Sequence, residues 1–274
     1  EKLEIGDVAF VTEKPKPVRN QALSYYRTVA VRKNLRIHNF EEVKSIEKNE
    51  NQFKLTTRNQ WNEEQLYTAE YVILATGYYG QPNMMGVKGE ELPKVSHYFK
   101  EAHPYFRKNV AIIGGKNSAV DAAIELERAG AHVTVLYRGS DYSPSVKPWI
   151  LPEFVSLVKH EKIKLEFNAT VDEITENDIT YTVNQHKTTI ANDFVFAMTG
   201  YKPDQEFLKN IGITIDRKTG RPTFHEKTME TNIENAYIAG VIAAGYDNNE
   251  IFIENGRFHG GIIAQSIKNK EKSL

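Results

Sequence analysis

The sequence predicts an α/β fold with two related domains, each combining a parallel sheet with an antiparallel β-meander. A Gly-rich strand-turn-helix-strand pattern over residues 109–138 is the first reason for this prediction. The second is an internal repeat, because residues 36–78 and 164–201 show the same order of short strands and both end in Thr-Gly-Tyr. The length of 274 residues also suits two ordinary domains.

The first copy of the repeat follows a predicted helix. Residues 21–33 are expected to be helical, since apolar side chains recur there on one face. Five short strands are then predicted, at 36–40, 43–46, 52–55, 65–67 and 71–78. The last of them ends at Thr76 and Gly77, which place a hydroxyl and an unobstructed backbone at the carboxyl edge of the sheet. Parallel sheets hold cofactors at that edge.

The second copy of the repeat predicts the same elements. Its strands are expected at 164–167, 171–174, 179–182, 188–190 and 194–201. Thr199 and Gly200 form the final turn. A strand that simply stops at a glycine would explain one such turn, but two turns after matching meanders weigh against that alternative.

The Gly-rich segment between the two copies predicts a nucleotide site. An apolar strand at 109–113 enters a turn that opens a helix ending near Gly130. The turn consists of Gly114, Gly115, Lys116, Asn117, Ser118 and Ala119. This arrangement points backbone N–H groups and a helix N-terminus at a dinucleotide pyrophosphate. An ordinary βαβ unit without a ligand is the alternative.

The residues that follow the next strand favour NADPH over NADH. Tyr137 and Arg138 stand where an NAD-preferring site has an acidic residue for the ribose 2′-hydroxyl. The turn itself departs twice from the usual Gly pattern. Ala119 at the third Gly position still permits close packing of helix and strand. Lys116 at the second position either turns to solvent or reaches a phosphate, and we favour the phosphate.

The remaining segments connect these units. Residues 79–104 are rich in Gly and Pro and are interpreted as a linker, and residues 204–231 as a second crossing between domains. A short buried strand is expected at 236–240, ending in Gly240. A helix is expected at 260–268, directly after His259.

Composition narrows the classes of partner. The net charge is −1 with acids and bases interspersed, so we expect neither nucleic acid nor a membrane as partner, but small molecules. Self-association into a homo-oligomer stays open. The absence of a long apolar run and of a signal peptide favours a cytoplasmic location. With no cysteine, these residues contain no disulfide, no thiolate metal site and no redox-active cysteine pair, and no metal site is expected.

The repeat also predicts that the chain is a fragment. The second copy follows a Gly-rich βαβ unit, whereas Gly6 is the only glycine ahead of Gly77. No phosphate-binding loop can therefore precede the first copy. Because the chain also begins at Glu1 rather than Met, we expect a first βαβ unit to be missing upstream.

These motifs together resemble the flavoproteins of thioredoxin-reductase type, which have two dinucleotide-binding domains. At closer range the chain is similar to the bacillithiol-disulfide reductase family. The segments that carry this closer likeness begin with Gly-Tyr-Tyr-Gly-Gln-Pro and lie at 77–82, 94–104, 137–149 and 252–261.

The resemblance implies two Rossmann-like domains, with an NADPH domain inserted between two parts of an FAD domain. The implied boundaries are 1–95 and 205–274 for the FAD domain and 96–204 for the NADPH domain, with the first FAD βαβ unit missing. It also implies FAD and NADPH as cofactors, and a low-molecular-weight thiol disulfide, bacillithiol disulfide, as substrate. The FAD phosphate loop and the cysteine of the family would lie upstream of Glu1.

The resemblance also assigns site residues. Gly114 to Ala119 would hold the NADPH pyrophosphate, and Arg138 the 2′-phosphate together with Lys147. Thr199 and Gly200 would lie at the same edge. The residues expected near FAD are Thr76, Gly77, Gly240, Gly256, His259 and Gly260. The last two begin a helix whose N-terminus would stabilise negative charge on the reduced flavin.

No general acid or base is assigned, although His97, His103 and His259 are candidates. Two alternatives stay open. A flavin-dependent monooxygenase would share the NADPH loop, but residues 92–97 lack the glycine expected in its linker. A non-catalytic NADPH-binding fragment would keep only the nucleotide site.

Overall fold

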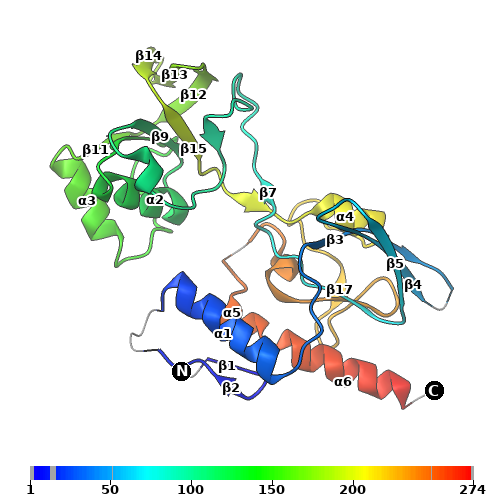
Figure 1. The fold of residues 1–274 in the computed structure, drawn as a ribbon. Helices are drawn as coiled ribbons and strands as arrows, with labels where there is room; N and C mark the ends of the chain where they lie inside the picture. The colour runs from blue at the N-terminus through cyan, green and yellow to red at the C-terminus, as the bar shows by residue number, and fades with distance from the viewer. Residues whose placement is uncertain (1–2, 13–16, 51, 248, 273–274) are drawn as a thin grey trace. The chain divides into compact units, whose positions relative to one another are not determined.

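The computed structural model describes residues 3–12, 17–50, 52–247 and 249–272 (Figure 1). The chain divides into two compact units. Unit 1 comprises Glu1–Gln81 and Lys202–Leu274, and unit 2 comprises Pro82–Tyr201. Unit 2 is therefore inserted in the sequence of unit 1. The domain boundaries at 95/96 and 204/205 stay predictions.

Unit 2 is built on a parallel sheet. Its strands, in spatial order, are β11 (Ile163–Glu166), β10 (His132–Leu136), β9 (Asn109–Ile113), β15 (Phe194–Ala197) and β8 (Val95–Ser96). Each neighbouring pair is parallel. β8 lies within the segment predicted to be a linker, so that interpretation was wrong for Val95 and Ser96. Two residues are too few for a recognisable pattern of alternation.

The sheet of unit 2 is buried on both faces. Helices α2 (Asn117–Arg128) and α3 (Leu151–Lys159) pack with Val110 and Ile112 of β9 in one core. Ala111 and Ile113 belong to a second core with the antiparallel meander of β12 (Ala169–Ile174), β13 (Asp178–Val183) and β14 (His186–Ala191). Burial on both faces explains why β9 is a continuous apolar run rather than an alternating one.

Unit 1 repeats this plan with a different sheet. The sheet order is β17 (Phe224–His225), β18 (Glu230–Thr231), β19 (Ala236–Ile238) and β6 (Val72–Leu74), and only β19 and β6 are parallel. The meander consists of β3 (Glu41–Lys48), β4 (Phe53–Asn59) and β5 (Glu64–Ala69). Ile46 and Phe53 of the meander share a core with β6, β19 and Ile263 of helix α6 (His259–Glu271).

The other elements are short or peripheral. Helix α1 (Arg19–Arg32) packs on the hairpin of β1 (Glu4–Ile5) and β2 (Val8–Ala9) through Tyr25 and Val29. The rest are β7 (Gln81–Pro82), β16 (Tyr201–Lys202), η1 (His103–Tyr105), α4 (Gln205–Asn210), η2 (Gly240–Ala244) and α5 (Ile253–Gly256). β7 and β16 pair where the chain passes between the units.

The internal repeat is present in the structure. In each copy a three-stranded meander precedes a parallel strand, and the glycine after that strand has a positive φ, 69° at Gly77 and 88° at Gly200. One predicted strand, 36–40, was wrong. Its counterpart β11 pairs with β10, whereas no described strand pairs with residues 36–40, and Phe40 is 78% exposed. Without a neighbouring strand, the backbone N–H and C=O groups of an extended segment have no ladder to join.

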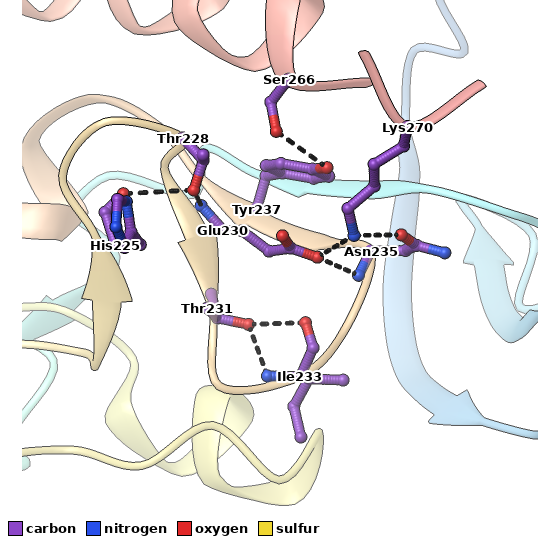
Figure 2. Close-up of polar contacts among 9 residues, drawn as sticks. All are labelled: His225, Thr228, Glu230, Thr231, Ile233, Asn235, Tyr237, Ser266 and Lys270. Carbon is purple, nitrogen blue, oxygen red and sulfur yellow. Dashed lines mark hydrogen bonds and ion pairs between the residues drawn. The ribbon is translucent and has the colours of Figure 1, made fainter. Parts of the chain in front are cut away.

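A polar network fixes α6 to the sheet of unit 1 (Figure 2). The ammonium group of Lys270 pairs with the carboxylate of Glu230 and donates to the side-chain oxygen of Asn235 at 2.8 Å. The backbone N–H of Asn235 donates to the same carboxylate at 2.8 Å. Nearer the middle of α6, the hydroxyl of Ser266 lies 3.5 Å from that of the fully buried Tyr237. The C-terminal half of α6 is thereby attached to β18 and β19.

A buried carboxylate organises the segment before β8 in unit 2. Glu90 is 6% exposed and accepts hydrogen bonds from the backbone N–H of Met85 at 2.9 Å and of Gly86 at 2.8 Å. Next to it, Gly89 has φ +84°, and a Cβ at this position would lie 1.9 Å from the carbonyl oxygen of Ile174. The glycine therefore permits close contact with the meander, and the carboxylate closes the turn that leads to it.

We expect Glu90→Ala to lower the free energy of unfolding of unit 2 by about 2–3 kcal/mol, because the backbone N–H groups lose a charged acceptor. Urea unfolding followed by Trp149 fluorescence, in a Trp61→Phe background, reports on unit 2. The matched control is the exposed neighbour Glu91→Ala, which should stay within about 0.5 kcal/mol of the parent chain. Equal effects of the two substitutions would contradict the structural role of Glu90.

Candidate functional site

The candidate nucleotide site lies at the carboxyl ends of β9, β10 and β15 in unit 2. Gly114 follows β9 with φ +136°, and a Cβ there would lie 2.5 Å from the carbonyl oxygen of Met198, directly after β15. No side chain fits at that position. The close approach of the two strands therefore requires glycine, and it directs the chain over the edge of the sheet into α2.

The N-terminus of α2 is open to an anion. The first hydrogen bond of the helix runs from the N–H of Val120 to the carbonyl of Lys116, so the N–H groups of residues 117–119 precede the helical ladder. The side chain of Lys116 makes no capping hydrogen bond, and the first turn contains no acidic residue. Free N–H groups and the positive end of the helix dipole suit a pyrophosphate.

Lys116 occupies a glycine position without strain. Its backbone is extended, with φ −100° and ψ −172°, a conformation that any residue adopts. Its side chain is exposed. The predicted reach of this side chain to a phosphate stays a prediction.

The ring of Tyr137 lies between two glycines. A Cβ on Gly115 would approach the ring to 2.4 Å, and one on Gly139 to 2.5 Å. The backbone N–H of Tyr137 donates to the carbonyl of Glu166 at 3.0 Å, which fixes the end of β10. Arg138 follows with an exposed side chain at the same edge. Arg138 is thus available to a nucleotide, while Tyr137 packs on the loop.

Asn117 connects the start of α2 to the loop that carries Lys147. Its side-chain N–H donates to the carbonyl of Ser145 at 2.9 Å, and its side-chain oxygen accepts the backbone N–H of Lys147 at 2.9 Å. Both ends of the amide group are therefore engaged within the protein. The backbone N–H of Asn117 points to no partner within the helix and can face a pyrophosphate.

Near Lys147, the carboxyl group of Asp121 is partly buried on α2. Burial raises the pKa of Asp121, and the positive charge of Lys147 partly offsets that effect. Lys147 therefore lies close enough to α2 for its charge to act there.

The Thr-Gly turn of unit 2 has a structural partner. The hydroxyl of Thr199 donates to the carbonyl of Asn83 at 2.7 Å, and the N–H of Asn83 donates to the carbonyl of Gly200 at 2.9 Å. The Thr199 hydroxyl therefore holds the segment by which the chain enters unit 2. The proposed contact of Thr199 and Gly200 with a cofactor is untested.

Two of the candidate histidines lie in unit 2. His97 follows β8, and its Nε2 lies 3.5 Å from the carboxylate of Glu90. Both ring nitrogens are buried, and neither has a hydrogen-bond partner in the described part of the chain. His103 lies in the exposed turn η1. Within the described ranges, no contact of His97 or His103 indicates a catalytic role, and both stay candidates.

The residues expected near FAD gather at the carboxyl ends of β6 and β19 in unit 1. Leu74 pairs with Ile238 in register, so Thr76 and Gly77 follow one strand and Gly240 the other. A Cβ added at Gly77, Gly240 or Gly260 would meet no atom within 4 Å, so a ligand could approach the backbone closely at these positions.

The same edge receives the N-terminus of α6. The Nδ1 atom of His259 accepts the backbone N–H of Gly240 at 3.1 Å. A Cβ on Gly256 would lie 3.5 Å from the Cα of Gly240, which shows how closely α5 packs there. The predicted residues Gly240, Gly256 and His259 are thus brought together, with Gly260 directly after them.

The contact with Gly240 fixes the tautomer of His259. Since Nδ1 is an acceptor, the ring proton of the neutral form resides on Nε2. Burial lowers the pKa of His259, which also favours the neutral ring. His259 can therefore donate one hydrogen bond from Nε2 while it holds the turn at Gly240.

The residues present fit the two cofactors to different extents. For a dinucleotide, unit 2 supplies a glycine turn at Gly114 and Gly115, which has no side chains, and the open N-terminus of α2. Unit 1 supplies open backbone at Gly77, Gly240 and Gly260 and the N-terminus of α6. It supplies no Gly-rich turn ahead of β3, because Gly6 is the only glycine before Gly77. The described part of unit 1 therefore leaves this edge open to a ligand, and the contacts of Gly77, Gly240 and Gly260 with FAD stay predictions.

Three side chains have roles that the sequence did not indicate. The amide of Asn117 as a loop clamp, the ring of Tyr137 between Gly115 and Gly139, and the buried carboxylate of Glu90 were not expected. Gly139, two positions after Tyr137, is the only one of the two glycines near that ring in the sequence, so the second role was not recognisable either. The other two depend on hydrogen bonds that no periodic pattern encodes. In the part of the chain that is described, no helix is long and apolar enough to cross a membrane.

Comparisons with known proteins give consistent matches. The family model described as pyridine nucleotide-disulphide oxidoreductase matches residues 1–240. The chain is 61% identical to bacilliredoxin reductase Bdr of Bacillus subtilis, over 99% of this chain and 83% of that protein. It is similar to the solved bacillithiol disulfide reductase of Bacillus cereus, with a TM-score of 0.94, 59% identity and coverage of 97% and 82%. A thioredoxin reductase of T. acidophilum matches with a TM-score of 0.69 at 25% identity, covering 92% and 81%.

We expect the stability of unit 1 to decrease as the pH falls from about 6.5 toward the lower folded-state pKa of His259. Over that interval the unfolded chain binds a proton that the folded chain rejects. The measurement is urea unfolding against pH, followed by Trp61 fluorescence in a Trp149→Phe background.

The control for this titration is His259→Asn, which keeps an acceptor for the Gly240 N–H but does not titrate. This variant should lose the part of the pH dependence of the free energy of unfolding that His259 contributes. If the free energy of unfolding changed with pH to the same extent in both proteins, His259 would not be the group responsible.

Proposed function

The chain belongs to the pyridine nucleotide-disulphide oxidoreductase family, and from this premise we propose that it is an FAD- and NADPH-dependent reductase of a low-molecular-weight thiol disulfide. We propose bacillithiol disulfide as that substrate. The observation that carries the proposal is the 61% identity to bacilliredoxin reductase over 99% of the chain. The geometry of the nucleotide site supports the cofactor assignment.

The residues of unit 2 would bind NADPH in two parts. The backbone N–H groups of residues 117–119 and the turn at Gly114 would hold the pyrophosphate, since no side chain intrudes there. The exposed guanidinium of Arg138 and the ammonium of Lys147 would pair with the 2′-phosphate. Charge-assisted hydrogen bonds of this kind are about twice as strong as neutral ones.

The residues of unit 1 would position FAD. Gly77, Gly240 and Gly260 leave the backbone accessible, and the N-terminus of α6 would stabilise negative charge near it. His259 would donate from Nε2 at the same edge while its Nδ1 holds Gly240. When bound, FAD supplies the transfer of electrons from NADPH to a disulfide. The 274 residues contain no cysteine, so none of their own thiols takes part.

The proposal is tested by loading the purified chain with FAD and following NADPH oxidation with different acceptors. We expect a yellow protein with stoichiometric flavin, which oxidises NADPH faster with bacillithiol disulfide than with glutathione disulfide. Peroxide or an oxygenated product in place of disulfide reduction would instead indicate a monooxygenase. A colourless protein that gains thermal stability with NADPH would indicate a nucleotide-binding module.

We expect Arg138→Ala to raise the Kd for NADPH by about 10- to 100-fold, because the 2′-phosphate loses a charge-assisted partner. The Kd for NADH should change by less than about twofold, since NADH lacks that phosphate. Both values can be measured from the fluorescence of the bound nucleotide.

The control for this substitution is Arg128→Ala, at the far end of α2, which removes only an exposed ion pair with Glu153. It should leave both Kd values unchanged. An equal loss of NADPH and NADH binding in Arg138→Ala would defeat the assignment of Arg138.

A further inference from the structure

The loop between β10 and α3 is built as a rigid support for Lys147. Val146 is 4% exposed and packs in the core with α2 and α3. Its N–H donates to the carbonyl of Ser143 at 3.1 Å, and the Ser143 and Ser145 hydroxyls lie 2.9 Å apart. The carbonyl of Lys147 then accepts the N–H of Ile150 at 3.0 Å as α3 begins. The backbone of Lys147 is therefore restrained on both sides along the chain.

Asn117, at the start of α2, restrains the backbone of Lys147 from a different element of the fold. It bonds to residues 28 and 30 positions later, donating to the carbonyl of Ser145 and accepting the N–H of Lys147. Both bonds run at 2.9 Å. A single planar group with one donor and one acceptor is needed for this pair, and asparagine provides it at this length.

The position of Asn117 in α2 places this contact at the candidate nucleotide site. Asn117 is the first residue of the helix, so its backbone N–H is one of those that face an anion. The side chain of the same residue holds the loop of Lys147. A single residue thus connects the part of the site that suits a pyrophosphate with the cation assigned to the 2′-phosphate.

The charged groups around Lys147 leave its ammonium available. Its charge acts on the carboxyl of Asp121, and its Nζ lies 6.0 Å from the centre of the Trp149 ring. The side chain is exposed. The described contacts hold Lys147 near α2 through its backbone, so loss of the two Asn117 hydrogen bonds would loosen the position of the cation relative to α2.

We propose that Asn117 is the positioning residue for selectivity between NADPH and NADH, acting through Lys147. This inference rests on the proposed NADPH function. It predicts that substitution of Asn117 weakens recognition of the 2′-phosphate more than binding of the rest of the nucleotide.

The test measures NADPH and NADH binding to the full chain by nucleotide fluorescence, with Asn117→Ala, Lys147→Ala and the double variant. Asn117→Ala should raise the Kd for NADPH about five- to tenfold, through loss of the two hydrogen bonds. The Kd for NADH should rise less than about twofold, because NADH has no 2′-phosphate. In the Lys147→Ala background, Asn117→Ala should have little further effect, since both act through one group.

Asn192→Ala is a matched control. Like that of Asn117, the Asn192 side chain makes two hydrogen bonds to backbone groups of unit 2, but its partners are the carbonyls of Asn109 and Phe194, at the amino ends of β9 and β15. It should lower thermal stability and leave the ratio of the two Kd values unchanged. Asn117→Ser serves as a second variant if the alanine variant folds poorly.

Equal weakening of NADPH and NADH, or additive effects of Asn117→Ala and Lys147→Ala, would overturn the positioning role. The failure of the proposed function is distinguishable from this outcome. If the parent chain itself binds NADPH no better than NADH, the NADPH assignment fails. If the parent is selective and Asn117→Ala keeps the same selectivity, only the inference about Asn117 fails.

Discussion

The close approach of two parallel strands at Gly114 is the constraint on which the nucleotide site depends. The carbonyl of Met198 lies where a Cβ of residue 114 would be, so β9 and β15 can end side by side only with glycine at that position. The chain then turns over the edge of the sheet, and α2 begins with its N–H groups facing outward. The order of the sheet places β10 next to β9, so Tyr137 and Arg138 emerge beside the same helix N-terminus.

Unit 1 also places a glycine after a parallel strand and a helix N-terminus at the carboxyl edge of its sheet, but with different residues. There Gly240 follows β19 with φ +76°, and the N–H of this glycine is held by His259 at the start of α6. The other end of α6 is attached through Lys270 to Glu230 of β18 and to Asn235, directly before β19. A helix fixed at both ends keeps its N-terminus at the carboxyl edge of the sheet, where its dipole acts on a bound anion.

Local sequence patterns predicted most elements of the fold. They failed where a segment becomes a strand only by pairing with a neighbouring strand. The family resemblance and the two-domain α/β fold are confirmed. Strand β9 was recognisable because burial on both faces leaves a continuous apolar run. Helix α2 was recognisable because burial on one face leaves apolar residues at helical spacing. Residues 36–40 have the composition of a strand but no described neighbour to pair with, and β8 was missed because its two residues become a strand only beside β15.

The sequence by itself determined the duplicated plan, the glycine turn at 114–115 and the charge at Arg138, because each is expressed in the spacing or type of adjacent residues. The tertiary structure decided which side chains at the site remain open to a ligand and which are bonded to backbone groups of the protein. Asn117, Thr199 and Glu90 all engage backbone groups, and for the first two the partners lie 28 or more positions away. Contacts of that kind depend on how the elements pack, and a single sequence carries no periodic signal for them.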